Sequence, residues 1–337
     1  MSTDSRVELT VGFMPLLDCA LLVVAHEVGI ARQQGLSLRL VRETSWANIR
    51  DRLAVGHFDA AHMLAPMVIA QNLGAGLFDT PLLAPVALGT GGNAITVSRE
   101  LWKAMRDSGA MIGAEPLVQA RALADVIARR NAAGQSALTL AMVFPFSCHN
   151  YQLRDWLQSA GIDPDRDVRL VVLPPPLLVD ALRSGQVDGF CVGEPWNSLA
   201  VDAGFGVIPV VCSDLWPRPP EKVLGMRAQL AEENAETVAA LIRCIQAASL
   251  WAADAGNHQD LAKLLSQPRY VGAPARLLHS ALVGEIRVDA QEPPIRRPEF
   301  ICFGPDDIVH DERHARFLLD HMRRAGQVPA IPASSSK

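Results

Sequence analysis

The chain lacks the cysteine spacing that zinc sites and disulfide-rich folds depend on. Its 337 residues include six cysteines, at Cys19, Cys148, Cys191, Cys212, Cys244 and Cys302. No two of them form a CxxC pair, so the sequence indicates neither a metal site nor a disulfide framework. We expect buried thiols in a reducing compartment.

Long hydrophobic runs and clusters of basic residues are also missing. The most apolar early stretch, residues 20–24, is too short to span a bilayer and is flanked by Asp18, His26 and Glu27. The polar residues 1–6 lead directly into a strand-like segment, so we expect no signal peptide, a cytoplasmic location and no membrane contact. The formal net charge is −5. Direct binding of nucleic acid is not expected, because neutralising phosphates needs concentrated lysine and arginine.

One short pattern occurs twice with identical internal spacing. The tetrapeptide GHFD at residues 56–59 leads through an apolar run to Pro66, and GQVD at residues 185–188 leads through another to Pro195. Each copy is typical of a helix that ends at glycine, a short buried strand, and a new helix with proline in its first turn. Two such helix N-termini could clasp a small anion, although glycine, aspartate and proline are also common turn residues. The repeat predicts two related halves.

Strands and helices alternate along the chain, which is the signature of an α/β fold with parallel strands. The length is that of about two domains, and 49% hydrophobic residues suffice for a large core. We expect lobe 1 from residues 1–92 plus 212–337 and lobe 2 from residues 93–211. The glycine run at residues 89–92 is a candidate hinge, and we expect residues 329–337 to be disordered.

The expected elements follow from hydrophobic periodicity and turn residues. The strands are expected at residues 7–13, 36–41, 59–63, 83–88, 94–97, 138–144, 168–173, 188–192 and 207–211. The helices are expected at residues 19–33, 119–132, 150–160, 177–184, 235–253, 260–266, 274–283 and 311–325, with others ending near residue 55 and beginning near Pro66. Residues 216–222 are expected to form a proline-rich crossing, and the helical tail beyond it is expected to pack on lobe 1.

Several segments resemble the nitrate- and bicarbonate-binding solute-binding proteins of ABC transporters. The resemblance runs from Val7 to beyond residue 265 and implies the class II periplasmic-binding-protein fold, in which two α/β lobes enclose a ligand cleft. The segments that carry it are residues 45–51, 62–67, 144–149, 161–165, 174–176, 191–197 and 220–222.

With no signal peptide expected, the chain most resembles a cytoplasmic branch of this family. That branch is a nitrate/nitrite sensor that regulates nitrate-assimilation genes. It sequesters an RNA-binding antiterminator response regulator without nitrate and releases it when nitrate binds. The expected partners are therefore nitrate or nitrite and the antiterminator. The alternative is the nitrate-binding component of an ABC transporter whose natural N-terminus has been trimmed or replaced.

The resemblance implies that Trp46, Asn93, His149, Gly193 and Lys222 hold the ligand. Nitrate is a planar, weakly hydrated monoanion and needs several in-plane donors. The transporters carry glutamine where this chain has Asn93, and the shorter asparagine side chain reaches less far toward the ligand. Bicarbonate-binding relatives carry an acidic residue that serves calcium where this chain has Lys222, so the lysine implies a monovalent anion and no metal.

Other residues near the expected ligand have supporting roles. Glu194 is expected to pair with Lys222 or His149, because a carboxylate is unfavourable beside a bare anion. The resemblance further places Met14, Pro15, Asp18 and Met63 on the pocket floor.

Four of these five ligand residues also have a structural interpretation. Trp46 could be a core aromatic, Asn93 a turn former, His149 a helix cap and Lys222 a solvated surface residue. Catalysis is a further alternative, since related folds occur in enzymes that handle thiamin precursors and Cys148 precedes His149. No third group is evident that would orient the histidine, so we expect no enzyme activity and no cofactor.

Overall fold

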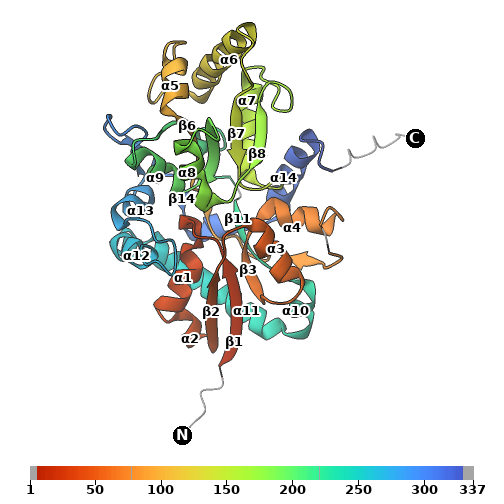
Figure 1. The fold of residues 1–337 in the computed structure, drawn as a ribbon. Coiled ribbons are helices and arrows are strands. Elements are labelled where there is room, and N and C mark those ends of the chain that lie inside the picture. The colour runs from red at the N-terminus through yellow and green to blue at the C-terminus, as the bar shows by residue number, and fades with distance from the viewer. Residues whose placement is uncertain (1–5, 77, 220, 329–337) are drawn as a thin grey trace, which may run out of the picture.

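Two separate five-stranded sheets, each flanked by helices, form two lobes (Figure 1). The computed structural model describes residues 6–76, 78–219 and 221–328. The predicted disorder of residues 329–337 lies outside these residues. Figure 1 shows lobe 1 at the bottom with β1, β2, β3 and β11, and lobe 2 at the top with β6, β7 and β8.

The sheet of lobe 1 has the order β2-β1-β3-β11-β4. Strands β2, β1 and β3 are parallel, and β11 runs antiparallel between β3 and β4. The strands are β1 (Val7–Phe13), β2 (Leu36–Arg42), β3 (Ala60–Leu64), β4 (Leu82–Leu83) and β11 (Lys222–Arg227).

The sheet of lobe 2 has the equivalent order β8-β7-β9-β6-β10, with β6 antiparallel between β9 and β10. All five strands come from residues 93–211. They are β6 (Asn93–Ser98), β7 (Thr139–Met142), β8 (Arg169–Val172), β9 (Gly189–Gly193) and β10 (Gly206–Val211).

The repeated tetrapeptide occupies the same place in both lobes. The carboxylate of Asp59 accepts a hydrogen bond from the Thr10 N–H at 2.7 Å, and that of Asp188 accepts one from the Thr139 N–H at 2.7 Å. Each aspartate therefore anchors the strand that follows it to the neighbouring parallel strand of its own sheet, which is β1 in lobe 1 and β7 in lobe 2. The predicted pair of related halves is confirmed by this shared geometry.

The antiparallel strands enter their sheets at equivalent positions. Lys222, the first residue of β11, pairs with Leu64 at the end of β3. Asn93, the first residue of β6, pairs with Gly193 at the end of β9. Since ligands of open α/β sheets bind beyond the carboxyl ends of the strands, this geometry places both residues where one lobe faces the other.

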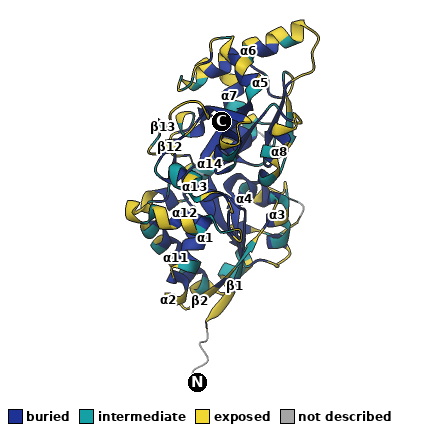
Figure 2. Cartoon of the chain, turned by 60° about the vertical axis from the view of Figure 1, so that its left-hand side comes forward, coloured by how far each residue is buried: buried dark blue, intermediate teal, exposed yellow. Residues whose placement is uncertain are grey.

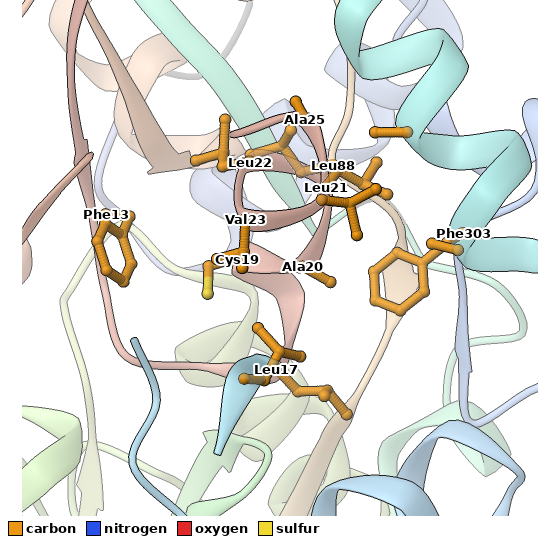
Figure 3. Close-up of a cluster of buried hydrophobic side chains, with 14 of the residues drawn as sticks. Phe13, Leu17, Cys19, Ala20, Leu21, Leu22, Val23, Ala25, Leu88 and Phe303 are labelled. Carbon is orange, nitrogen blue, oxygen red and sulfur yellow. The ribbon is translucent and has the colours of Figure 1, made fainter. Parts of the chain in front are cut away.

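Helix α1 (Ala20–Glu27) forms the centre of the largest hydrophobic cluster. Its residues from Ala20 to Ala25 are all buried, because the sheet of lobe 1 covers one side and α11 (Ala235–Ala253) the other. Figure 3 shows α1 with Phe13 on one side and Phe303 on the other. Truncating a buried leucine such as Leu21 to alanine costs about 2–5 kcal/mol in comparable cores.

The remaining helices cover the sheets, and Figure 2 shows their exposed outer faces around buried strands. In lobe 1 and the C-terminal part these helices are α2 (Ile30–Gln33), α3 (Trp46–Ala54), α4 (Ala65–Asn72), α10 (Ala228–Glu233), α12 (His258–Leu265), α13 (Ala275–Leu282) and α14 (Glu312–Arg324). In lobe 2 they are α5 (Arg99–Arg106), α6 (Pro116–Ala132), α7 (Cys148–Ser159), α8 (Leu178–Arg183) and α9 (Trp196–Asp202).

Short elements complete the chain. Two small sheets have two strands each: β12 (Glu285–Ile286) pairs with β13 (Ile295–Arg296), and β5 (Thr90–Gly91) pairs with β14 (Ile301–Cys302). The short 3-10 helices are η1 (Leu17–Cys19), η2 (Pro175–Leu177), η3 (Cys212–Asp214), η4 (Ala255–Asn257) and η5 (Pro305–Ile308). Within the described ranges, no single helix has the length and apolar composition to cross a membrane; the helices at Ala235–Ala253 and Ala255–Leu265 pass that test together, across an 83° bend.

Three expectations need correction. The helix expected at residues 19–33 is interrupted at Gly29, whose φ of 87° is left-handed. The strand expected at residues 83–88 is limited to Leu82–Leu83, because the pairing with β11 is interrupted after Leu83 and resumes only as an isolated bridge between Ala87 and Val223. The proline-rich crossing at residues 216–222 ends in a strand, since Lys222 already pairs with β3.

The C-terminal tail does not pack on lobe 1 alone. Helices α11 and α12 pack on α1, as expected. The following segment reaches lobe 2, where the Val288 carbonyl accepts a hydrogen bond from the N–H of Ile208 on the edge strand β10. Helix α14 contacts α4 of lobe 1 and α7 of lobe 2. The tail therefore connects the two lobes.

Candidate functional site

Lys222 is the centre of a buried ion cluster between the lobes. Its side chain is fully buried, and its Nζ lies 2.9 Å from Asp18 Oδ2 and 2.6 Å from Glu221 Oε1. Burial alone would lower the pKa of Lys222, but the charges of Asp18 and Glu221 raise it above its usual value. Lys222 is therefore a permanent buried cation rather than a solvated surface residue.

Asp18 joins this lysine to a histidine of β3. Its Oδ1 lies 3.1 Å from Nε2 of His62, which is also fully buried. Burial opposes ionisation of Asp18, but the positive charge of Lys222 prevails and holds its pKa well below the usual range. Asp18 was expected on the pocket floor, and the structure makes it the counter-ion of Lys222.

Glu221 connects the cluster to lobe 2. Its Oε2 accepts a hydrogen bond from Asn93 Nδ2 at 2.7 Å, and the same amide donates to Gln152 Oε1 at 2.9 Å. The three residues come from the end of the crossing, from β6 and from α7. They thus link both lobes in one buried polar network.

Helix α7 contributes His149 in its first turn. The Ser147 side chain caps this helix by accepting from the Asn150 N–H, which orients the turn. His149 is fully buried, its Nε2 lies 3.8 Å from Glu221 Oε1, and neither ring nitrogen has a hydrogen-bond partner. Burial, reinforced by the charge of Lys222, lowers its pKa well below the usual value, so the ring is neutral and still has one N–H to donate.

Trp46 approaches the cluster from the first turn of α3. Its ring lies edge-on to His62 at 5.3 Å between centroids, and Lys222 Nζ lies 5.9 Å from its ring centre. The indole Nε1 is buried without a hydrogen-bond partner. Buried N–H groups are rarely left unpaired, and this one lies beside the cation Lys222, so it is available to an acceptor from outside the chain.

Gly193 lies where the backbone of β9 comes closest to the cluster. A Cβ at this position would lie 3.3 Å from Asn93 Oδ1 and 3.6 Å from Asp18 Oδ2. Glycine therefore allows the backbone to approach these polar groups closely.

The expected pairing of Glu194 is wrong. The carboxylates that contact the Lys222 ammonium are those of Asp18 and Glu221. Glu194 Oε2 instead accepts a hydrogen bond from the Ser198 N–H at the start of α9. Burial raises the pKa of Glu194 to about 7.

Two of the N–H groups at the helix starts that could clasp an anion already have partners in the chain. The Ser198 N–H is taken by Glu194, and the Ala65 N–H of α4 donates to the Glu221 carbonyl. Protein atoms thus occupy these two donors. The acceptors are the Glu194 side chain and the Glu221 backbone carbonyl.

The cluster is suited to hold a small oxyanion. Trp46 Nε1, the neutral His149 ring and Gln152 Nε2 supply donors without hydrogen-bond partners, and Lys222 supplies positive charge. Within the described part of the chain, no group of three or more His, Cys, Asp or Glu side chains could hold a metal ion. Cys148 does not suit a nucleophile, because burial and the charge of Glu221 raise its pKa well above the usual value and keep it a thiol.

Sequence reasoning missed Gln152 and gave Glu221 no role of its own. Gln152 follows His149 by three positions on α7, a spacing that puts both on one helix face, so this signal was present in the sequence. Glu221 precedes Lys222, and only the three-dimensional structure shows that its carboxylate turns back on the neighbouring ammonium.

Proteins of nitrate transport are similar to this chain over most of its length. The nitrate import ATP-binding protein NrtC of Synechocystis sp. is 36% identical over 282 residues, which cover 83% of this chain and 40% of NrtC. The nitrate/nitrite binding protein NrtA of Synechococcus elongatus is 32% identical over 286 residues, which cover 82% of this chain and 62% of NrtA. The chain thus spans between 40% and 62% of the length of these two relatives.

The fold has a close counterpart among solved structures. The crystal structure of the periplasmic nitrate-binding protein NrtA from Synechocystis PCC 6803 matches with a TM-score of 0.88 at 25% identity, and the match covers 98% of this chain and 83% of that one. This likeness and the equivalent strand orders of the lobes confirm the predicted class II periplasmic-binding-protein fold. Residues 3–266 match the NMT1-like family, and the chain belongs to that family.

Proposed function

We propose that this protein binds nitrate or nitrite between its two lobes. The observation that carries the proposal is the set of unpartnered buried donors on Trp46, His149 and Gln152 beside the buried cation Lys222. The three acceptor oxygens of nitrate match three such donors, and the two oxygens of nitrite match two of them. The similarity to NrtA proteins named for nitrate and nitrite supports this ligand class.

The test is calorimetric titration with nitrate, nitrite and bicarbonate, the last with and without calcium. We expect saturable binding of nitrate or nitrite. In the Trp46→Phe variant, which keeps the ring and removes the N–H, binding should weaken about 10-fold to 100-fold, since a hydrogen bond to a charged group contributes about 1.5–3 kcal/mol.

Trp102→Phe is the matched control. Trp102 is also buried with an unpartnered Nε1, but it lies on α5 and belongs to the lobe 2 core. Its substitution should leave the affinity unchanged. Absence of saturable binding of both nitrate and nitrite would refute the proposal.

The role of ligand binding has two candidates. The names of the relatives favour the nitrate-binding component of an ABC transporter. The second candidate is a cytoplasmic sensor that sequesters an antiterminator, and the thiols support only its reducing location. All six cysteines are free, and Cys191 Sγ lies 3.9 Å from Cys212 Sγ, a proximity that suits a reducing compartment.

The two roles differ in location and in thermodynamic coupling. Recovery of the native protein from the periplasm would support the transporter role and contradict the sensor. A sensor must bind nitrate more weakly in complex with the antiterminator, by the same factor by which nitrate weakens the complex. Equal nitrate affinity with and without the antiterminator would refute the sensor role.

A further inference from the structure

The buried charges around Lys222 leave one excess negative charge when Asp18 and Glu221 are both ionised. Both carboxylates contact the same ammonium, and all three side chains are buried. His62 and His149 are neutral, because burial lowers the pKa of each. A bound monoanion would add a second negative charge, and an uncompensated buried charge costs several kcal/mol.

The Glu221 carboxylate is surrounded by charged and titratable groups from several elements. Its oxygens contact Lys222 and the amide of Asn93. The titratable groups that face it are Asp18 of η1, Cys148 and His149 of α7, Cys212 of η3 and Lys222 of β11, with His62 of β3 behind Asp18.

Among these groups Glu221 is the best proton acceptor. Asp18 is held ionised by Lys222 and His62. A proton on His149 would put a second cation near Lys222 in a fully buried place. For Glu221, burial raises the pKa and outweighs the attraction of Lys222.

We propose that a monovalent oxyanion enters this site together with one proton, which the Glu221 carboxylate takes from solvent. The inference rests on the proposed function. One O–H bond forms on Glu221, and no other bond forms or breaks. Asp18 then balances Lys222 alone, so the occupied cluster carries only the charge of the anion. The new O–H adds a donor to those of Trp46 and His149.

The test is nitrate titration of the full chain in two buffers of different ionisation enthalpy. The difference in heat gives the number of protons taken up, and we expect one proton per nitrate over the pH range in which Glu221 is ionised in the free protein and protonated in the complex. Across that range the dissociation constant should rise about tenfold per pH unit, because the free protein must first acquire the proton.

Two variants assign the proton. Glu221→Gln mimics the protonated carboxyl, so it should bind nitrate with no proton uptake and with an affinity independent of pH. Asp289→Asn is the control: this buried carboxylate pairs with Arg99 and accepts from the Gln291 N–H, away from the cluster, so proton uptake should be unchanged. Infrared difference spectra of the wild-type protein provide a readout that needs no variant, since nitrate should produce the C=O band of a protonated carboxyl.

The outcomes separate this inference from the proposed function. Nitrate binding without proton uptake, or Glu221→Gln with the proton uptake of the wild type, would overturn the inference and leave the function intact. Failure to bind either nitrate or nitrite at every pH would overturn both.

Discussion

Replacing Lys222 by methionine tests the ion cluster in the ligand-free protein. The substitution keeps most of the apolar stem and removes the ammonium between Asp18 Oδ2 at 2.9 Å and Glu221 Oε1 at 2.6 Å. At an effective dielectric constant of about 20, each contact contributes about 6 kcal/mol of Coulomb attraction. Desolvation of the ammonium offsets much of this, so we expect a net loss of about 3–5 kcal/mol in the free energy of unfolding.

The loss should depend on pH with a defined sign. Without Lys222 the carboxyls of Asp18 and Glu221 face each other in a buried place, which raises the pKa of at least one above its unfolded value. A group with a raised folded pKa stabilises the fold at low pH and loses that contribution as the pH rises. Lys222→Met should therefore be less destabilised near pH 5 than near pH 8, and adding Glu221→Gln should restore part of the loss at the higher pH.

Urea unfolding, extrapolated to water, measures these free energies. Lys263→Met is the matched control, because Lys263 Nζ lies 3.0 Å from Asp260 Oδ1 in an exposed pair. Exposed pairs contribute about 1 kcal/mol or less. If Lys222→Met costs no more than Lys263→Met, or if Glu221→Gln fails to restore any stability, the assignment of a buried charge cluster is wrong.

Three further predictions follow from other contacts. Ionisation of the buried Glu194 carboxyl opposes folding, so the stability of Glu194→Gln relative to wild type should increase by about 3 kcal/mol as the pH rises from about 4.5 to about 7, and should not increase further above pH 7. Parallel urea titrations of both proteins would measure this difference, and a difference that does not change with pH would contradict the prediction. Asp59→Ala and Asp188→Ala should each cost about 1–3 kcal/mol, since each removes the acceptor of one strand N–H, and unequal losses in unfolding experiments would argue against equivalent roles. His321→Ala removes the 2.9 Å contact to Asp155 that joins α14 to α7, so amide exchange should accelerate in α14 and remain slow in both sheets; equal acceleration in the sheets would contradict a local role.

The sequence predicted most of the architecture, because the signals are local. The long helix at Ala235–Ala253 matches its predicted bounds, and the repeated tetrapeptide correctly predicted two related lobes. Strand β11 was missed because it follows a proline-rich segment and contains Gly225. Its strand conformation depends on pairing with β3 and β4, which lie far away in sequence.

The polar network of the site could be predicted only in part. The resemblance pointed to residues that the structure brings together, including Trp46, His149 and Lys222. It could not predict which carboxylates neutralise Lys222. Asp18 and Glu221 take that position through their three-dimensional placement, and Glu194, at the start of α9, does not reach it.

The placement of β11 between β3 and β4 also determines the order in which the protein can fold during its synthesis. The strands of lobe 2 all lie within residues 93–211, so its sheet can be completed before the rest of the chain leaves the ribosome. Lobe 1 begins first and finishes last, because β3 lacks its neighbour until Arg227 has been made. Throughout that interval one edge of β3 remains unpaired, and an unpaired strand edge is open to aggregation. The nascent chain therefore depends on rapid arrival of β11 for the protection of its N-terminal lobe.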